Sequence, residues 1–317
     1  GLAYPMCIRK PSKKKNIIET KDLTKRYGQH LAANAVSLHV KRGEIYGFIG
    51  RNGAGKTTCM KMICGLTCPT SGSIQLFGKS AQESGKLRSR IGSLIEEPGL
   101  YYEMTAYENL KCKCLMTGID QKGYIDGILE LVGLSYARNR KAKAFSLGMR
   151  QRLGIAMTLV GNPDILVLDE PINGLDPQGI AEMRQLFVRL KEERHLAIMI
   201  SSHILEELSK LADTFGIIHD GKLLQEISHA QLMDKCSNYV EIITPQPEQV
   251  SVSLEKMGYT RFKVMDKETV QVFERLDETA AMNRQLILDG CTIVQSRIVA
   301  TELEDYYFKI TGGNQNA

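Results

Sequence analysis

The sequence lacks long apolar runs, a complete set of zinc ligands, internal repeats and low-complexity tracts. No window approaches the ~18 to 20 continuous apolar residues of a membrane-spanning helix, so we expect that the chain does not itself cross a bilayer. The first eight residues are too short for the apolar core of a secretory signal, and charged residues follow them. We therefore expect a cytoplasmic protein.

The eight cysteines do not suggest a metal centre. Cys112 and Cys114 are separated by one residue, Cys64 and Cys68 by three, and no second pair with a nearby histidine completes a zinc set. Because a cytoplasmic compartment keeps thiols reduced, we expect free structural cysteines.

The charge balance is modest for the length of the chain. Its 317 residues suffice for about two domains, and the 43% apolar content suffices for a sizeable core. A net charge of +5 does not indicate a dedicated nucleic-acid binder, and we expect no nucleic-acid partner. Much of the excess is local, since residues 9–15 contain five cations. We interpret residues 1–15 as a solvated basic tail or a remnant of cloning.

Residues 16 to about 220 alternate short apolar runs with helical periodicity, which predicts a largely parallel sheet covered by helices. Buried strands are predicted over 45–49, 165–168, 197–200 and 215–218. Apolar residues at helical spacing predict core-facing helices over 125–132, 153–160 and 180–190. From about 100 to 160 the pattern is helical without strands, so we expect a helical subdomain inserted into the α/β unit.

A second, smaller α+β unit is expected over residues 237–317, which places the first domain at 16–236. Its pattern predicts strand, helix, strand, strand, helix and strand over 239–244, 247–257, 262–265, 269–273, 278–289 and 291–298. This order is typical of the ferredoxin-like arrangement.

The strongest motif is a glycine-rich loop between a predicted strand and a predicted helix. Residues 50–57 read G-R-N-G-A-G-K-T and fit G-x-x-x-x-G-K-[ST]. The glycines let backbone N–H groups turn toward phosphates, and the helix N-terminus adds a positive dipole end, so an ordinary glycine-rich turn is disfavoured. Lys56 would reach the β- and γ-phosphates, and Thr57 would ligate Mg²⁺. The candidate nucleotide-binding residues are Gly50, Asn52, Gly53, Ala54, Gly55, Lys56, Thr57 and Thr58.

Two carboxylates follow the predicted buried strand 165–168. Asp169 is the candidate metal residue, and Glu170 is the candidate general base that deprotonates an attacking water. Acidic residues often end strands, so this pair is weak evidence by itself. After a phosphate-binding loop it indicates hydrolysis.

A third element begins a helix at residues 145–152, which read F-S-L-G-M-R-Q-R. Ser146 and Gly148 at that N-terminus could form a second anion site, since a hydroxyl and free backbone N–H groups point outward there. Taken alone, Ser146 is an ordinary helix cap.

The order Lys56, Ser146, Asp169, Gly174-Leu175-Asp176 and His203, with Tyr27 upstream, resembles the nucleotide-binding subunit of an ATP-binding cassette (ABC) transporter over residues 16 to about 230. The resemblance implies a P-loop NTPase cassette with a RecA-like core, a helical subdomain, and ATP and Mg²⁺ as cofactors. It implies that Tyr27 stacks on adenine and that His203 senses the γ-phosphate. It also implies that Ser146 and Gly148 contact ATP bound by a second copy, and that Asp176 links the two sites. Without the resemblance, Tyr27 could pack at a strand end, Asp176 could cap a helix and His203 could begin one.

Two residues differ from those typical of the family and indicate a particular branch of it. Met149 stands where the family has a final glutamine, so the contact with the second copy is altered there. Glu96 stands where most relatives have a glutamine that approaches the metal, and with Ser93–Pro98 and Tyr101-Tyr102 it resembles the bacitracin-resistance and lantibiotic-immunity branch of exporters. A carboxylate at Glu96 can bind Mg²⁺ or orient water, and its charge should make nucleotide affinity depend more on Mg²⁺.

The resemblance implies a transport motor on the cytoplasmic face of the plasma membrane, bound through membrane-spanning permease subunits. Two copies would clamp two ATP molecules, and hydrolysis would reopen them. The segment 98–102 suits a groove for the permease, although Tyr101 and Tyr102 could simply pack on the cassette. An alternative is a soluble cassette ATPase that acts on ribosomes or DNA. One phosphate loop and a spacing of 90 residues from Lys56 to Ser146 disfavour it. A regulator without turnover is disfavoured by Glu170.

Overall fold

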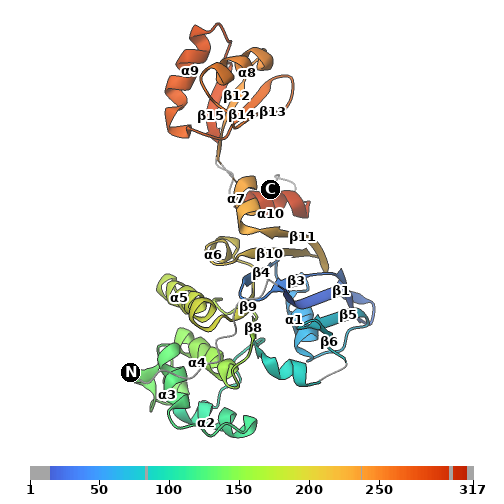
Figure 1. Cartoon of the computed structure of the whole chain (residues 1–317), viewed down its shortest axis with the longest axis vertical. Coiled ribbons are helices and arrows are strands. Elements are labelled where there is room, and N and C mark those ends of the chain that lie inside the picture. Colours follow the sequence, from blue (N-terminus) through green and yellow to red (C-terminus); the bar gives the residue numbers. More distant parts are fainter. Residues whose placement is uncertain (1–14, 83–84, 237, 300–302, 313–317) are drawn as a thin grey trace. The chain divides into compact units, whose positions relative to one another are not determined.

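The structure is a computed structural model that describes residues 15–82, 85–236, 238–299 and 303–312. Contacts between residues divide the chain into two compact units, Gly1–His229 and Ala230–Ala317 (Figure 1). The division falls slightly before the boundary expected after residue 236, because helix α7 (His229–Lys235) belongs almost entirely to the second unit. The basic stretch over residues 1–15 lies outside the described residues except for Lys15.

The first unit contains a six-stranded sheet in the order β11-β10-β4-β9-β8-β7. Its strands are β4 (Ile45–Ile49), β7 (Ile91–Leu94), β8 (Ile165–Leu168), β9 (Ala197–Ser202), β10 (Thr214–His219) and β11 (Lys222–Ser228). All pairings are parallel except that of β10 with β11. Every residue of β4, β8 and β9 is buried, as continuous apolar runs require. The four predicted strands are confirmed as neighbours in this sheet.

An antiparallel sheet, which the sequence pattern did not predict, forms the other β layer of the first unit. Its order is β2-β1-β5-β6, with β3 paired to β1. The strands are β1 (Asn16–Tyr27), β2 (His30–Val36), β3 (His39–Lys41), β5 (Ser71–Leu76) and β6 (Lys79–Ser80). Bulges interrupt the pairing of β1 with both β2 and β5. The predicted, largely parallel sheet therefore does not include the strands over residues 16–41 and 71–80, which the sequence pattern did not reveal because they lack a steady alternation of apolar and polar residues.

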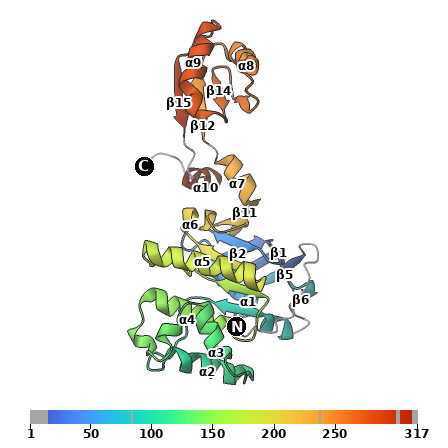
Figure 2. The ribbon, with the colours of Figure 1, turned by 60° about the vertical axis from the view of Figure 1, so that its left-hand side comes forward.

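Helices cover the parallel sheet and form the predicted helical segment. They are α1 (Lys56–Cys64), α2 (Ala106–Thr117), α3 (Tyr124–Leu131), α4 (Leu147–Leu159), α5 (Pro177–Arg194) and α6 (Leu205–Ser209), with 3-10 turns at Gly85–Arg90, Ser135–Ala137 and Ala142–Ala144. Figure 2 shows α2, α3 and α4 grouped together in green. Residues 100–160, all described, contain no strand beyond an isolated bridge between Thr105 and Lys141.

The second unit confirms the predicted ferredoxin-like arrangement. Its elements after α7 are β12 (Tyr239–Ile243), α8 (Pro247–Lys256), β13 (Phe262–Val264), β14 (Thr269–Val272), a 3-10 turn (Leu276–Glu278), α9 (Thr279–Leu288), β15 (Gln295–Val299) and α10 (Leu303–Thr311). The sheet order β13-β14-β12-β15 is antiparallel throughout. Val240 and Ile242 of β12 pack with Val250 and Leu254 of α8 in its own core. Helix α10 was not predicted.

The described cysteines are all free thiols: Cys59, Cys64, Cys68, Cys112, Cys114, Cys236 and Cys291. Burial raises the pKa of the Cys59 and Cys64 thiols to about 12, so both stay protonated at neutral pH. Among the described residues, no helix is long and apolar enough to cross a membrane.

Candidate functional site

The glycine-rich loop connects β4 to α1, as predicted. Gly53 and Gly55 have positive φ angles of +82° and +102°. A Cβ atom on Gly55 would lie 2.4 Å from the carbonyl oxygen of Ala32, so this position excludes any side chain. The N–H of Gly221 donates to the carbonyl oxygen of Ala54 at 3.0 Å. Strand β2 and the turn between β10 and β11 therefore fix the loop from behind, while residues 51–53 are exposed.

Lys56 is buried in the loop with 5% of its side chain exposed. Its ammonium donates to the carbonyl oxygens of Gly50 at 2.6 Å and Arg51 at 3.2 Å. The ammonium also lies 3.2 Å from Oε1 of Glu170. A buried charge requires such partners, and a phosphate oxygen that enters the loop could replace them.

Thr57 and Asp169 meet at the start of α1. The hydroxyl of Thr57 donates to Oδ2 of Asp169 at 2.6 Å, although the two residues are 112 positions apart. Asp169 is buried, and Ser201 donates to its Oδ1 at 2.5 Å. A hydroxyl and one carboxylate, completed by phosphates and water, fit the hard oxygen ligands that Mg²⁺ prefers. The described residues contain no cluster of three or more His, Cys, Asp or Glu side chains around one point, and such a magnesium site does not need one.

Glu170 is held between two cationic or potentially cationic side chains. Its Oε2 lies 2.9 Å from Nδ1 of His203, and its Oε1 faces the ammonium of Lys56. Oε1 is buried and has no hydrogen-bond partner among the described residues. The backbone of Glu170 has φ +48°, an uncommon conformation for a residue other than glycine. The carboxylate therefore lies at the phosphate loop with Oε1 paired only to the Lys56 ammonium, and a phosphate that binds Lys56 would leave Oε1 available as the acceptor that a general base requires.

Ser201 connects the two carboxylates and was missed by the sequence analysis. Its hydroxyl donates to Asp169 and accepts from the N–H of Glu170 at 2.9 Å. Strand β9 brings it beside β8, and the adjacent Ser202 instead accepts from the N–H of Ile204. The available signal was its position two residues before His203 at the end of a buried strand.

Glu96 lies at the end of β7, next to the end of β8. The N–H of Asp169 donates to the carbonyl oxygen of Leu94 at 2.8 Å, two residues before Glu96. The carboxylate of Glu96 accepts a hydrogen bond from Lys61 of α1 at 2.5 Å. That hydrogen bond raises the pKa of Lys61 despite partial desolvation, and the negative charges of Glu96 and Asp169 act in the same direction. No motif in the sequence indicates Lys61.

Tyr27 ends β1 with 49% of its surface exposed. The ammonium of Lys25 lies 5.0 Å from the centroid of its ring. The ring is therefore accessible to a planar ligand such as adenine, and one cation already interacts with it.

Ser146, Gly148 and Asp176 form a separate group. Ser146 caps α4 by accepting from the N–H of Met149 at 3.3 Å, and Asp176 caps α5 by accepting from the N–H of Gly179 at 3.2 Å. A Cβ atom on Gly148 would lie 3.7 Å from Leu175, so the starts of these helices are neighbours. Ser146 and Asp176 thus act as helix caps, which is the alternative that the sequence also allowed for each of them. Their expected role toward a second copy stays a prediction.

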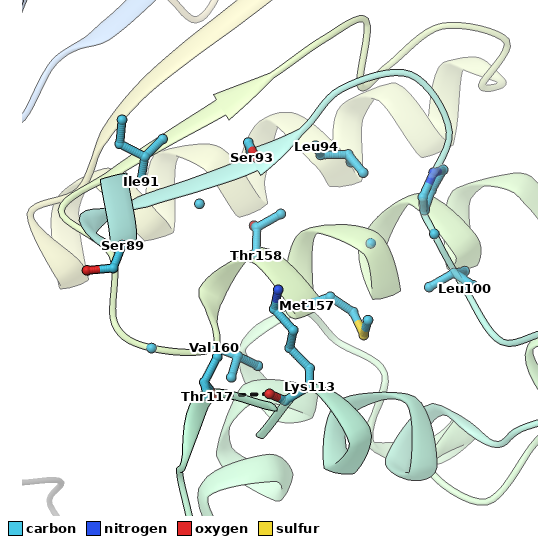
Figure 3. Close-up of a pocket in the computed structure, with 15 residues that line it drawn as sticks. Ser89, Ile91, Ser93, Leu94, Leu100, Lys113, Thr117, Met157, Thr158 and Val160 are labelled. Carbon is cyan, nitrogen blue, oxygen red and sulfur yellow. Dashed lines mark hydrogen bonds between the residues drawn. The ribbon is translucent and has the colours of Figure 1, made fainter. Parts of the chain in front are cut away.

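A cavity of about 620 Å³ lies between β7, together with the segment after it, and the helical segment (Figure 3). Leu94, Pro98 and Leu100 line one side, and Lys113 and Met157 line the other. The N–H of Tyr101 donates to the side chain of Asn109 at 2.8 Å, which fixes the segment to α2. The rings of Tyr101 and Tyr102 remain 53% and 45% exposed.

The fold and the site together define a P-loop nucleotide-binding cassette with an inserted helical segment. The family model described as ABC transporter matches residues 33–173. The bacitracin transport ATP-binding protein BcrA of Bacillus licheniformis is 43% identical over 94% of this chain and 98% of its own length. The lantibiotic transport ATP-binding protein SrtF of Streptococcus pyogenes is 45% identical over 66% of this chain and 90% of its own length.

A solved structure of the ATP-binding cassette MJ0796, a dimer in a post-hydrolysis state bound to ADP and phosphate, has a TM-score of 0.60 at 25% identity. It covers 67% of this chain and 98% of that one. The chain therefore belongs to the ABC transporter family, as an ATP-binding subunit.

Proposed function

We propose that the chain is the ATP-hydrolysing motor of an exporter for peptide antibiotics of the bacitracin or lantibiotic type. Residues 16–236 form the motor domain in this proposal, and residues 237–317 form an accessory domain. The observation that carries the proposal is the carboxylate of Glu170, which lies between Lys56 and His203 and beside the contact of Thr57 with Asp169. The names of BcrA and SrtF support the class of cargo.

Each polar group at the site has a role in hydrolysis. Residues 50–58 bind the phosphates, and Lys56 compensates the charge on the β- and γ-phosphates. Thr57 and Asp169 would hold Mg²⁺, whose charge stabilises the transferred phosphoryl group. Glu170 accepts the proton of the attacking water through Oε1. His203 holds the other oxygen of Glu170 and stands ready to sense the γ-phosphate, while Tyr27 stacks on the adenine.

The second anion site acts on ATP held by a second copy of the chain. Ser146 and Gly148 at the start of α4 approach that γ-phosphate, and Asp176 connects the two sites. The dimeric post-hydrolysis structure of MJ0796 supports this assembly. Because Leu175 adjoins Gly148, a shift of the segment before α5 would displace the start of α4.

The permease docks at the cavity beside Pro98–Tyr102. Pro98, Gly99 and Leu100 line this cavity together with residues of α2 and α4, and the exposed Tyr101 and Tyr102 follow Leu100 directly in the sequence. The motor is then peripheral on the cytoplasmic face of the plasma membrane. A soluble ATPase acting on ribosomes or DNA is disfavoured, because transport ATP-binding proteins match the chain nearly end to end.

The test uses cells that produce the chain together with the membrane protein that co-purifies with it. We expect these cells to tolerate more bacitracin or lantibiotic than cells with either protein alone, and Lys56→Met to remove the gain. Tolerance that is unchanged, or co-purification with ribosomes in place of a membrane protein, would contradict the proposal.

A further inference from the structure

Two side-chain contacts join one face of α1 to the ends of neighbouring strands. Thr57 and Lys61 are four residues apart and therefore share a face of the helix. Thr57 contacts Asp169 after β8, and Lys61 contacts Glu96 after β7. Leu94 and Leu168 are paired in the sheet, so Glu96 and Asp169 follow the ends of two neighbouring strands.

The contact between Lys61 and Glu96 contributes little to folding. Glu96 is 65% exposed and Lys61 is 31% exposed, and ion pairs in such positions stabilise proteins only slightly. Glu96 also has φ +68°, which is unfavourable for a residue with a side chain. Glu96 is strained and gains little stability from its contact with Lys61. This combination indicates that Glu96 has a role at the adjoining nucleotide site.

The negative charge of Glu96 explains why the nucleotide site needs Lys61. The site already contains Asp169 and Glu170, and a third free carboxylate would repel a polyphosphate. The ammonium of Lys61 compensates this charge, and it also lies within electrostatic range of Tyr27 and Asp169. No other cation contacts Glu96 among the ion pairs of the described residues.

We propose that Lys61 is a positioning residue of the nucleotide site, which holds Glu96 in an ion pair so that the site accepts a polyphosphate despite the additional carboxylate. The proposal rests on the proposed function, because it requires nucleotide at residues 50–58. It also changes the expectation that the charge of Glu96 makes nucleotide affinity depend more on Mg²⁺. With Lys61 in place this charge is compensated, so the stronger dependence on Mg²⁺ should appear only when Lys61 is removed.

The experiment is a double-mutant cycle on the full chain, with a fluorescent ATP analogue titrated in excess Mg²⁺ and in EDTA. Lys61→Met should raise Kd about fivefold or more, with the larger effect in EDTA, and the effect should shrink at ~0.5 M salt. Glu96→Gln should bind only slightly more tightly than wild type, because Lys61 already compensates the charge of Glu96. With Gln at position 96, Lys61→Met should therefore change Kd by less than about twofold. The double variant and Lys61→Arg should both lie within about twofold of wild type.

Lys143→Met is the matched control, because Lys143 forms a comparably exposed ion pair with Glu103 at 3.0 Å. It should leave Kd within about twofold of wild type. Lys61→Met could instead raise Kd by the same factor in the wild-type chain and in the Glu96→Gln chain. That result would show that Lys61 acts independently of Glu96 and would overturn the inference. An unchanged Kd in Lys61→Met would also overturn it. Failure of the wild type to bind nucleotide is a different result, which contradicts the proposed function itself.

Discussion

Ser201→Ala should impair hydrolysis through two groups that Ser201 orients. The hydroxyl is fully buried, donates to Asp169 at 2.5 Å and accepts from the N–H of Glu170 at 2.9 Å. Its removal leaves one buried N–H without this acceptor, at a cost of about 2 kcal/mol in the free energy of unfolding. Loss of a group that orients metal and base residues typically lowers activity or metal affinity 10- to 100-fold, and we expect about 30-fold in kcat.

The assay is steady-state phosphate release as a function of Mg²⁺ concentration, with thermal unfolding measured in parallel. Ser202→Ala is the matched control, because Ser202 is equally buried in the same strand but accepts from Ile204, away from both carboxylates. We expect Ser201→Ala to lower kcat and to require more Mg²⁺, and Ser202→Ala to affect mainly stability. Similar kinetics for the two variants, or a wild-type Mg²⁺ dependence in Ser201→Ala, would show that Ser201 does not orient Asp169 and Glu170.

Variants of the phosphate loop, of a structural carboxylate and of the permease surface should each have a distinct effect. Gly55→Ala should weaken nucleotide binding at least about tenfold, because its Cβ would meet Ala32, whereas Gly78→Ala, at φ +77° in open space, should cost only about 1 kcal/mol in stability. Although burial alone would raise it, the pKa of Asp164 is lowered, because Arg90 and Arg42 bond to the carboxylate. Asp164→Asn should therefore cost about 1 kcal/mol at neutral pH, and denaturant titrations should show this difference vanish as the pH falls below the ordinary Asp range. Tyr101→Ala should weaken co-purification with the membrane partner and spare ATP binding, and equal losses in both assays would contradict its docking role.

The parts of the site that could be predicted are contiguous in sequence. The loop of residues 50–57 and the strand that ends in Asp169 and Glu170 carry their chemistry within a few positions, so their spacing is informative. The parallel strands were predictable for the same reason, since burial on both faces requires continuous apolar runs. The ferredoxin-like order of the second unit followed from its alternating helical and strand periodicity.

The missed features depend on contacts between distant positions. Ser201 reaches Asp169 only because β9 lies beside β8, and Lys61 reaches Glu96 only because the first turns of α1 lie near the ends of β7 and β8. No local pattern encodes either contact. The antiparallel strands β1 and β5 escaped prediction because bulges break their register and their exposed positions carry mixed residues.

If Glu170 is the general base of an ATP-dependent dimer, Glu170→Gln should differ from wild type in two measurements. Glu170→Gln should bind Mg·ATP normally and should lower steady-state phosphate release by ~10² or more. In sedimentation, it should form a dimer with Mg·ATP and remain mostly monomeric with ADP. Phosphate release at the wild-type rate by Glu170→Gln would contradict the assignment of Glu170, and a stable dimer without nucleotide would contradict the proposed ATP-dependent clamp.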